Sequence, residues 1–229
     1  MQFQRYAIYV VPDGNALAEF GASWLGWDAA KGVRVAHPPT GLPLDKITQT
    51  PGKYGFHGTV HWPFALRDPT DQGVARMLQV LAAFCATRAP LQIEGLKLAR
   101  LGRFLALVPE GDTSALVKTA AELVQKIQPL RAAPTGTEIA RRRTGHLNPE
   151  QDALLTRWGY PYVMDQFRFH MTLTGKLPKT RLAEVEAVLN TLLPSILPRC
   201  FDIEALCLMG EDHEGKFHVI KRLPFGGGF

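Results

Sequence analysis

The feature that most constrains the fold is a tripeptide, His-x-Thr, that occurs twice in similar settings. The second copy lies in the stretch 168–173, Arg-Phe-His-Met-Thr-Leu, and the first in the stretch 55–60, Gly-Phe-His-Gly-Thr-Val. Apolar and polar residues alternate in both copies, and such alternation predicts β-strands in which residues two apart face the same side. We therefore expect the His and Thr of each copy to share a polar face, with their apolar neighbours in the core.

The segments that follow the two copies also match. A Gly-basic-Phe triplet ends at Phe104 after the first copy, and another ends at Phe217 at the same separation from the second. A helix-patterned segment and an apolar run lie between each His strand and its triplet. We therefore predict an α+β fold, in which internally duplicated β-α-β-β units form two antiparallel-sheet lobes with helices outside and a central cleft.

The length and composition allow one large domain. The chain has 229 residues, of which 46% are hydrophobic, enough to bury a substantial core. We expect residues 1–229 to form a single bilobal domain with halves at roughly 1–130 and 131–229 and with strands exchanged between the lobes.

Local signals predict several individual elements. Apolar residues recur at helical spacing over 17–25, and Gly26 is placed to end that helix. Asn148, followed by Pro149 and Gln151, is a strong helix start. The Pro- and Gly-rich segment 28–54 predicts a long loop, and so does the basic segment 130–147, which has no apolar period.

The paired motifs in a duplicated α+β frame resemble the two-histidine (2H) phosphoesterase superfamily, which includes 2′-5′ RNA-ligase-like proteins and cyclic nucleotide phosphodiesterases. The Trp-containing stretches 20–28 and 158–163 look like the branch encoded beside phosphonate-degradation genes, a domain of unknown function. The resemblance covers nearly the whole chain and implies that both histidines are catalytic. Gly58 departs from a regular strand and indicates either a bulge or a close backbone approach.

The two motifs predict an acid–base pair. With pseudo-twofold packing, we expect His57 opposite His170 and Thr59 opposite Thr172. Imidazole has a pKa of about 6.5, so near neutral pH one ring can take a proton from water while the other protonates a leaving alkoxide. The Thr hydroxyls would bind phosphate oxygens. The sequence leaves open which His is the base.

Further substrate-binding candidates are basic and aromatic. Arg168 and the run Arg141–Arg143, in particular Arg142 and Arg143, could offset charge on a phosphate, although such a run could equally be a solvated face. The candidates for stacking on a base or sugar, or for simple packing, are Tyr54, Trp62, Tyr160 and Tyr162.

The predicted activity is that of a cyclic phosphodiesterase that needs neither a metal ion nor a cofactor. Its substrate would be a 2′,3′-cyclic nucleotide or a ribose cyclic phosphate, because a strained ring with a good leaving alkoxide suits acid–base hydrolysis. Two alternatives stay open: a non-catalytic module that binds nucleotides or RNA ends, and a 2′-5′ RNA-ligase-like activity. The arginines bunch in the segment 130–147, which favours a small phosphorylated substrate over RNA.

Other chemistries lack the residues that they need. His61 is expected on the same face as His57, but four residues of strand separate the two by about 13 Å, too far to share a metal ion. The sequence has no Gly-x-Ser-x-Gly elbow, and Gly175-Lys176-Leu177 lacks the upstream glycine and the Ser/Thr of a nucleotide-binding loop. Serine-hydrolase and nucleoside-triphosphatase activities are therefore not expected.

Net charge and cysteine usage indicate the partners and the compartment to expect. The net charge of +5 favours anionic partners. Three scattered cysteines, without the spacing of a metal site or a disulfide framework, indicate a reducing compartment. The N-terminal apolar run is too short for a signal peptide, and no 18-residue apolar span follows. We expect a cytoplasmic protein without membrane contact, whose oligomeric state the sequence does not indicate.

Overall fold

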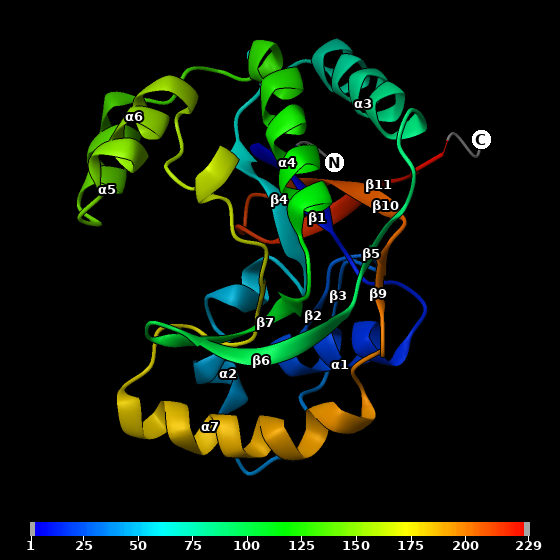
Figure 1. Ribbon diagram of the computed structural model, residues 1–229, viewed down its shortest axis with the longest axis vertical. Coiled ribbons are helices and arrows are strands. Elements are labelled where there is room, and N and C mark those ends of the chain that lie inside the picture. Colours follow the sequence, from blue (N-terminus) through cyan, green and yellow to red (C-terminus); the bar gives the residue numbers. More distant parts are fainter. Residues whose placement is uncertain (1–2, 227–229) are drawn as a thin grey trace.

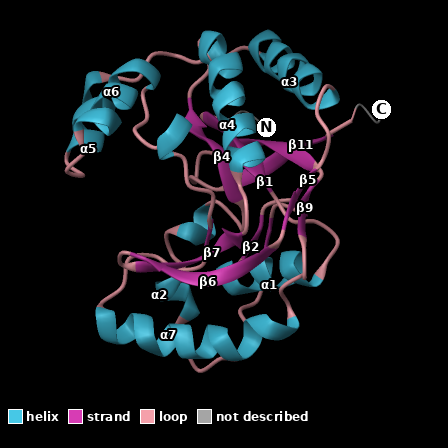
Figure 2. Ribbon diagram, in the orientation of Figure 1, coloured by secondary structure: helices cyan, strands magenta, loops and turns pink. Residues whose placement is uncertain are grey.

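The computed structural model describes residues 3–226, and a seven-stranded antiparallel sheet forms its centre (Figures 1 and 2). The strand order is β11-β10-β1-β4-β8-β7-β6. These strands are β1 (Arg5–Val10), β4 (Gly58–Phe64), β6 (Gly95–Leu101), β7 (Phe104–Glu110), β8 (Met171–Thr172), β10 (Ala205–Glu211) and β11 (Phe217–Pro224). Two small sheets pair β2 (Trp27–Asp28) with β3 (Val33–Arg34), and β5 (Leu91–Ile93) with β9 (Phe201–Ile203).

Helices lie outside the strands (Figure 2). The α-helices are α1 (Ala16–Leu25), α2 (Leu44–Ile47), α3 (Asp71–Ala86), α4 (Ser114–Ile127), α5 (Gly136–Arg143), α6 (Pro149–Trp158) and α7 (Lys179–Leu192). Short 3₁₀ turns are η1 (Pro51–Lys53), η2 (Gln128–Leu130), η3 (Met164–Gln166) and η4 (Leu193–Ser195). The predicted α+β class with antiparallel strands is confirmed. None of the helices in the described range is long and apolar enough to cross a membrane.

Each half of the sheet combines strands from both repeats. The strand β4, which carries the first motif, adjoins β1 and through it the hairpin β10-β11 of the second repeat. The strand β8, from the second motif, adjoins the hairpin β7-β6 of the first repeat. Helices α3 and α4 cover the first half, and α7 covers the second on the opposite side of the molecule (Figure 1).

The two halves meet at one tightly packed point. Strand β4 pairs with β8 through Gly58 and Met171. A Cβ on Gly58 would lie 2.1 Å from the Phe169 ring, so only glycine fits there. The close neighbour is thus the ring of a side chain, and not the backbone approach that Gly58 was expected to mark. Trp24 adds a further tie, because its indole nitrogen donates to the Leu173 carbonyl at 2.9 Å.

The irregularity of β4 lies beyond Gly58. Thr59 pairs with Tyr9, but His61 pairs with Ile8, so the register shifts between these pairs. The shift is a β-bulge, which breaks the alternation of faces. His61 is consequently fully buried, with its ring stacked on Trp62 at a centroid distance of 4.1 Å. The expectation that His61 shares the polar face of His57 is wrong for this reason.

The local predictions hold at capped termini and fail in the loops. Gly26 ends α1 with a φ of 72°, and a capping box of Asn148 and Gln151 starts α6, as predicted. Residues 130–147 contain helix α5 instead of a loop. Thr135 and Glu138 form its capping box, and an exposed helix needs no apolar stripe. The segment 28–54 likewise contains β3, α2 and η1.

Candidate active site

The register of β4 and β8 fixes how the two motifs face each other. In an antiparallel pair, the residues that flank Gly58 and Met171 lie crosswise, so His57 comes opposite Thr172 and Thr59 opposite His170. This corrects the expectation that like residues face each other. The pseudo-twofold axis passes between Gly58 and Met171, which makes the histidines equivalent but places them on a diagonal. Diagonal neighbours in an antiparallel pair are about 7–8 Å apart, and somewhat less at Cβ, which leaves room for a phosphoryl group between the rings.

His57 is held in one tautomer against an aromatic ring. Its Nδ1 lies 2.9 Å from the Gly55 carbonyl oxygen, and its Nε2 lies 3.1 Å from Thr59 Oγ1. Because a carbonyl oxygen only accepts, Nδ1 carries the proton and Nε2 is the basic nitrogen, to which the Thr59 hydroxyl donates. The ring stacks on Tyr9 with a centroid distance of 3.7 Å.

The surroundings keep His57 neutral. Burial lowers the pKa of His57 to about 4; the hydrogen bond to Gly55 opposes this shift, and the charge of His170 adds to it. A ring with this pKa carries no charge at neutral pH and can accept a proton. The influence of His170 on this pKa also shows that the two imidazoles lie within electrostatic range of each other.

His170 repeats part of this arrangement. Its Nδ1 lies 2.9 Å from the Arg168 carbonyl oxygen, again two residues earlier in the chain. Its Nε2 is therefore also the nitrogen that is left for chemistry. The nearest aromatic ring recorded for it is Phe104, at the start of β7, with a centroid distance of 5.9 Å.

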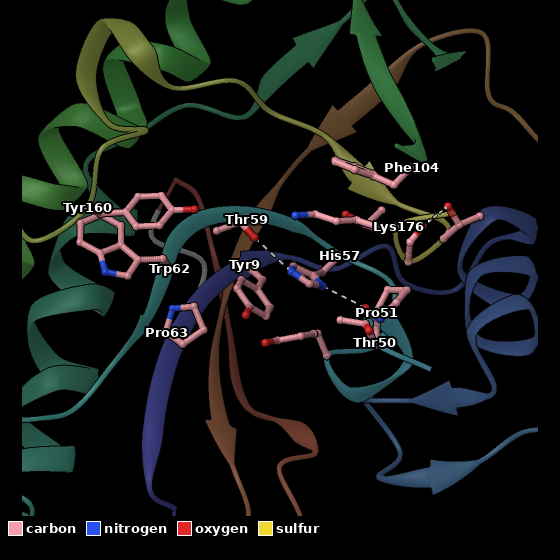
Figure 3. A pocket seen from close by; sticks show the side chains of 15 residues that line it. Tyr9, Thr50, Pro51, His57, Thr59, Trp62, Pro63, Phe104, Tyr160 and Lys176 are labelled. Carbon is pink, nitrogen blue, oxygen red and sulfur yellow. Dashed lines mark hydrogen bonds between the residues drawn. The ribbon is translucent and has the colours of Figure 1, made fainter. Parts of the chain in front are cut away.

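A cleft of about 320 Å³ opens beside His57 (Figure 3). Thr59 and Thr172 line it together with His57, and so does Phe104, the neighbour of His170. His170 itself is absent from the described lining. The stacked rings of Trp62 and Tyr160, 4.6 Å apart, stand at one end of the cleft. Thr50, Pro51 and Lys176 stand at the other end.

The remaining predicted residues divide into two groups. Tyr54 lines the cleft, and the Arg142 guanidinium lies 4.7 Å from the ring centre of Tyr160, which also lines it. Arg143, Arg168 and Tyr162 are exposed and lie outside the described lining.

These three residues are engaged elsewhere. Arg143 Nε donates to Asp152 at 2.7 Å, and Arg168 Nη1 donates to two main-chain carbonyls of its own turn. Tyr162 is 45% exposed and meets the Tyr160 ring edge-on. The structure thus gives no support for a substrate contact by any of them.

Tyr9 and Lys176 are among the residues of the cleft that the sequence analysis missed. Tyr9 lies in a strand whose apolar character indicates core, and only its pairing beside β4 brings it under His57. Lys176 follows the second motif closely in the sequence, and this short separation is the signal that could have identified it. In Figure 3 its side chain reaches into the cleft.

Thr174 holds the turn that carries Lys176. Its side chain is 1% exposed, and its Oγ1 accepts from Leu105 N at 3.0 Å and donates to the Gly175 carbonyl at 2.9 Å. The Gly175 amide in turn donates to the Ile47 carbonyl at 2.8 Å. The hydroxyl of Thr174 is therefore used in structure, whereas those of Thr59 and Thr172 face the cleft.

Comparison with known proteins assigns the family. A family model described as "Protein of unknown function (DUF1045)" matches residues 59–218. The chain belongs to this family. The matched range includes Thr59, His170 and Thr172, together with the hairpin β6-β7 and strand β10. His57 lies just before it.

Two curated relatives are named ribose 1,5-bisphosphate phosphokinase PhnN. The protein from Janthinobacterium sp. (strain Marseille) is 34% identical over 234 residues, which cover 97% of this chain and 51% of the relative. The protein from Laribacter hongkongensis (strain HLHK9) is 34% identical over 236 residues, 96% of this chain and 51% of the relative. The chain thus spans about half the length of the curated relatives it matches.

Solved structures match over nearly the whole chain but weakly. E. coli LigT complexed with 3′-AMP has a TM-score of 0.49 at 11% identity, covering 97% of this chain and 98% of LigT. The protein TT0787 of Thermus thermophilus has a TM-score of 0.48 at 13% identity, covering 98% and 100%. A structure described as a phosphoesterase has a TM-score of 0.43 at 13% identity, covering 97% and 98%. The predicted membership of a family described only as a domain of unknown function is confirmed by the family model.

Proposed function

We propose that this chain is a phosphodiesterase that opens a five-membered cyclic phosphodiester by acid–base catalysis, without a metal ion or other cofactor. The observation that carries the proposal is the crosswise arrangement of two His-x-Thr motifs on one sheet face, with both Nδ1 atoms tied to main-chain carbonyls. This arrangement presents two Nε2 atoms and two hydroxyls to one phosphoryl group.

His57 is the general base in this proposal. Its neutral ring, with a pKa of about 4 and a protonated Nδ1, offers the lone pair of Nε2 to a water molecule. As the water oxygen forms a bond to phosphorus, Nε2 takes the proton of that water. The Thr59 hydroxyl, which donates to Nε2 when no ligand is bound, turns to a non-bridging phosphate oxygen.

His170 is the general acid. Its imidazolium donates the Nε2 proton to the sugar oxygen as the bond from that oxygen to phosphorus breaks, and the ring opens to a phosphomonoester. His57 then releases its proton to solvent and His170 regains one, so that atoms and charge balance over a turnover. The carbonyl of Arg168 accepts from Nδ1 in both protonation states and keeps the ring oriented.

Three further groups stabilise the transition state in this scheme. Thr59 and Thr172 donate to the non-bridging oxygens, and Lys176 brings a positive charge to the same cleft. Hydrogen bonds aimed at developing charge in a site shielded from water are among the strongest contributions to catalysis. Phe104 restricts solvent beside His170.

A ribose cyclic phosphate is the substrate that we favour over a 2′,3′-cyclic nucleotide. The curated relatives are named for ribose 1,5-bisphosphate, and they are about twice as long as this chain. Opening a ribose 1,2-cyclic phosphate leaves a ribose phosphomonoester, the class of compound in that name. We place the reaction in the cytoplasm, which is consistent with the free thiols of Cys85, Cys200 and Cys207.

The phosphokinase activity in the relatives' name finds no site in the described residues. Gly210 to Lys216 has the spacing Gly-x-x-x-x-Gly-Lys of a nucleotide-binding loop. That loop must lead into a helix and end in Ser or Thr, whereas this stretch is the turn of the β10-β11 hairpin and continues into Phe217. We therefore assign the kinase activity of the relatives to their other half.

The decisive experiment measures hydrolysis of ribose 1,2-cyclic phosphate and 2′,3′-cyclic AMP in EDTA by the wild type and the His57→Ala/His170→Ala variant. We expect turnover by the wild type alone. Turnover by both would overturn the assigned chemistry. No turnover by either, with tight binding of the cyclic phosphates by the wild type, would favour the non-catalytic binding module instead.

A further inference from the structure

The wall of the cleft beside His57 carries polar groups that the proposed reaction does not use. Tyr9 is 1% exposed and lines the cleft. Tyr54 and Tyr160 line the same cleft. A tyrosine hydroxyl both donates and accepts hydrogen bonds, so these three phenols can bind a polar ligand in the cleft.

Arg142 is an unsatisfied group at this wall. It lies on α5, half-buried against the Tyr160 ring, and its Nε is buried without a hydrogen-bond partner in the described part of the chain. Glu138 lies near enough to act on it, but that carboxylate accepts from Thr135 in the capping box of α5. Arg143, the next residue, is paired with Asp152.

These groups form one cluster. Burial raises the pKa of Tyr160; the charge of Arg142 opposes the rise, and Tyr54 adds to it. Burial also raises the pKa of Tyr9, with contributions from Tyr54 and Tyr160 and an opposing one from Arg5. Arg5 itself is bound to Glu211, so Arg142 is the cation of the cluster that has no carboxylate partner within residues 3–226.

Each tyrosine ring in the cleft already packs on a neighbouring group. Tyr9 stacks on His57, Tyr160 is contacted by Trp62 and by Arg142, and Tyr54 stacks on Phe217 at 5.0 Å. This packing reduces the area of ring face that is left for a ligand, whereas each phenol keeps a hydroxyl that can bind one. Such a surface suits an anion better than a nucleobase, which binds by stacking.

We propose that Tyr9, Tyr54, Tyr160 and Arg142 form a second anion-binding subsite, which takes a second phosphoryl group on the substrate. The inference rests on the proposed function and narrows it to cyclic phosphodiesters that also carry a phosphomonoester. A cyclic phosphodiester has one negative charge, which the Thr hydroxyls, Lys176 and the protonated histidine already match. An additional unpaired guanidinium with phenol donors matches the second, more highly charged phosphoryl group.

The test compares ribose 1,2-cyclic phosphate with its 5-phosphorylated form. We expect the wild type to prefer the 5-phosphorylated substrate by about 10- to 100-fold in kcat/KM, the range of a charge-assisted hydrogen bond. Arg142→Gln should reduce this preference at least tenfold, and Tyr160→Phe, which keeps the ring stack, should reduce it less. Arg143→Gln is the matched control, because it removes an equal charge from the same helix and should keep the preference.

Two results would overturn the subsite while the proposed function stands. One is equal kcat/KM of the wild type for the two substrates, and the other is a preference that survives Arg142→Gln. A preference that Lys176→Gln removes and Arg142→Gln does not would place the second phosphoryl group at the opposite end of the cleft, and would also overturn it.

A binding measurement separates the subsite from the chemistry. If neither substrate is turned over, the subsite can still be tested by measuring the binding of ribose 5-phosphate and of ribose by calorimetry. Tighter binding of ribose 5-phosphate that is weakened at least tenfold by Arg142→Gln, and kept by Arg143→Gln, would support the subsite although the phosphodiesterase proposal had failed. Equal binding of both compounds, or binding that does not respond to Arg142→Gln, would overturn it.

Discussion

The two His-x-Thr motifs are equivalent in sequence and in sheet position, yet their surroundings differ. His57 lies between β4 and the Tyr9 ring of β1, bonded through both ring nitrogens. Within the described part of the chain, His170 is hydrogen-bonded through Nδ1 only. Its ring lies farther from its aromatic neighbour, Phe104 of β7, than the His57 ring does from Tyr9. The difference arises because β1, which supplies Tyr9, precedes both repeats.

This asymmetry teaches how a duplicated fold obtains two different roles from one motif. The repeats supply two imidazoles on a diagonal, and a strand outside the repeats buries one of them. Burial disfavours the charged form, so the reaction that we propose assigns the role of base to the buried ring. It assigns the role of acid to the more open ring. The predictions below test this division, beginning with the largest effect.

Loss of either histidine should abolish most of the turnover. We expect His57→Ala and His170→Ala each to lower kcat by about 10²- to 10⁴-fold, the usual contribution of general acid–base catalysis. A cyclic diester whose leaving oxygen departs without protonation distinguishes the two roles, because its hydrolysis needs a general base but no general acid. His170→Ala should recover much of its activity on such a substrate, and His57→Ala should not. Equal recovery in both variants would contradict the assigned roles.

The pKa of His57 should appear in the pH dependence of stability. Because the folded pKa of about 4 lies below the unfolded value of about 6.5, the unfolded chain binds the proton more readily. The free energy of unfolding should therefore fall as the pH is lowered from about 6.5 to about 4, by at most about 3 kcal/mol from this residue. Urea titrations should show a smaller fall in His57→Asn. An identical slope in that variant would rule out the assigned shift.

The pKa of His57 also predicts the pH at which activity falls on the acid side. If neutral His57 is the base, kcat/KM should stay high as the pH falls below 6.5 and should decline only near pH 4. NMR titration of the ring should give the same value. A decline centred near 6.5 in both measurements would show that His57 is not desolvated as the structure indicates.

The two threonines should contribute less than the histidines. Thr59→Val and Thr172→Val each remove a hydroxyl that donates to a phosphate oxygen, and such charge-assisted bonds contribute about 1.5–3 kcal/mol. We expect kcat/KM to fall by about 10- to 100-fold for each. Thr174→Val is a useful contrast, because its hydroxyl serves the Lys176 turn and its loss should affect thermal stability as well.

A methyl group added at Gly58, where the two halves of the sheet meet, should destabilise the protein. Gly58→Ala places a Cβ within 2.1 Å of the Phe169 ring, so we expect a loss of about 1–3 kcal/mol in the free energy of unfolding. Phe169→Leu should relieve part of this loss when both changes are combined. If the losses in the free energy of unfolding of the two single variants simply add in the double variant, the Phe169 ring is not what excludes the added methyl group.

The smallest effect is expected outside the cleft. Arg143→Gln breaks an exposed ion pair with Asp152, which typically contributes less than about 1 kcal/mol. Turnover should stay within about twofold of the wild type, since the side chain lies outside the described lining. A tenfold loss of kcat/KM would return Arg143 to the site that the sequence analysis assigned to it.

The sequence predicted those parts of the fold that depend on local patterns. Alternation around His57 and His170 identified both polar faces, and the capping signals at Gly26 and Asn148 gave correct helix ends. Helix α5 was missed because it buries no apolar stripe. The organisation into two lobes at 1–130 and 131–229 stays a prediction, although the sheet shows that strands of both repeats share each half.

The candidate site could be predicted only in part. His57, Thr59, His170 and Thr172 followed from the repeated motif, whose two-residue spacing is a local property of strands. The crosswise register did not, because pairing between residues far apart in sequence is set by packing at Gly58. Arg142 and Arg143 are adjacent and alike in sequence, and only the fold turns one to Tyr160 and the other to Asp152.

By itself, the sequence determined the class of fold and the duplication, and it predicted the chemistry of the motif, because these depend on periodicity and on side-chain identity. The tertiary structure decided which histidine is desolvated, which arginine packs on Tyr160 and which tyrosines line the cleft. These properties depend on desolvation and on distances between side chains, and both arise only when strands β1, β4 and β8 lie side by side.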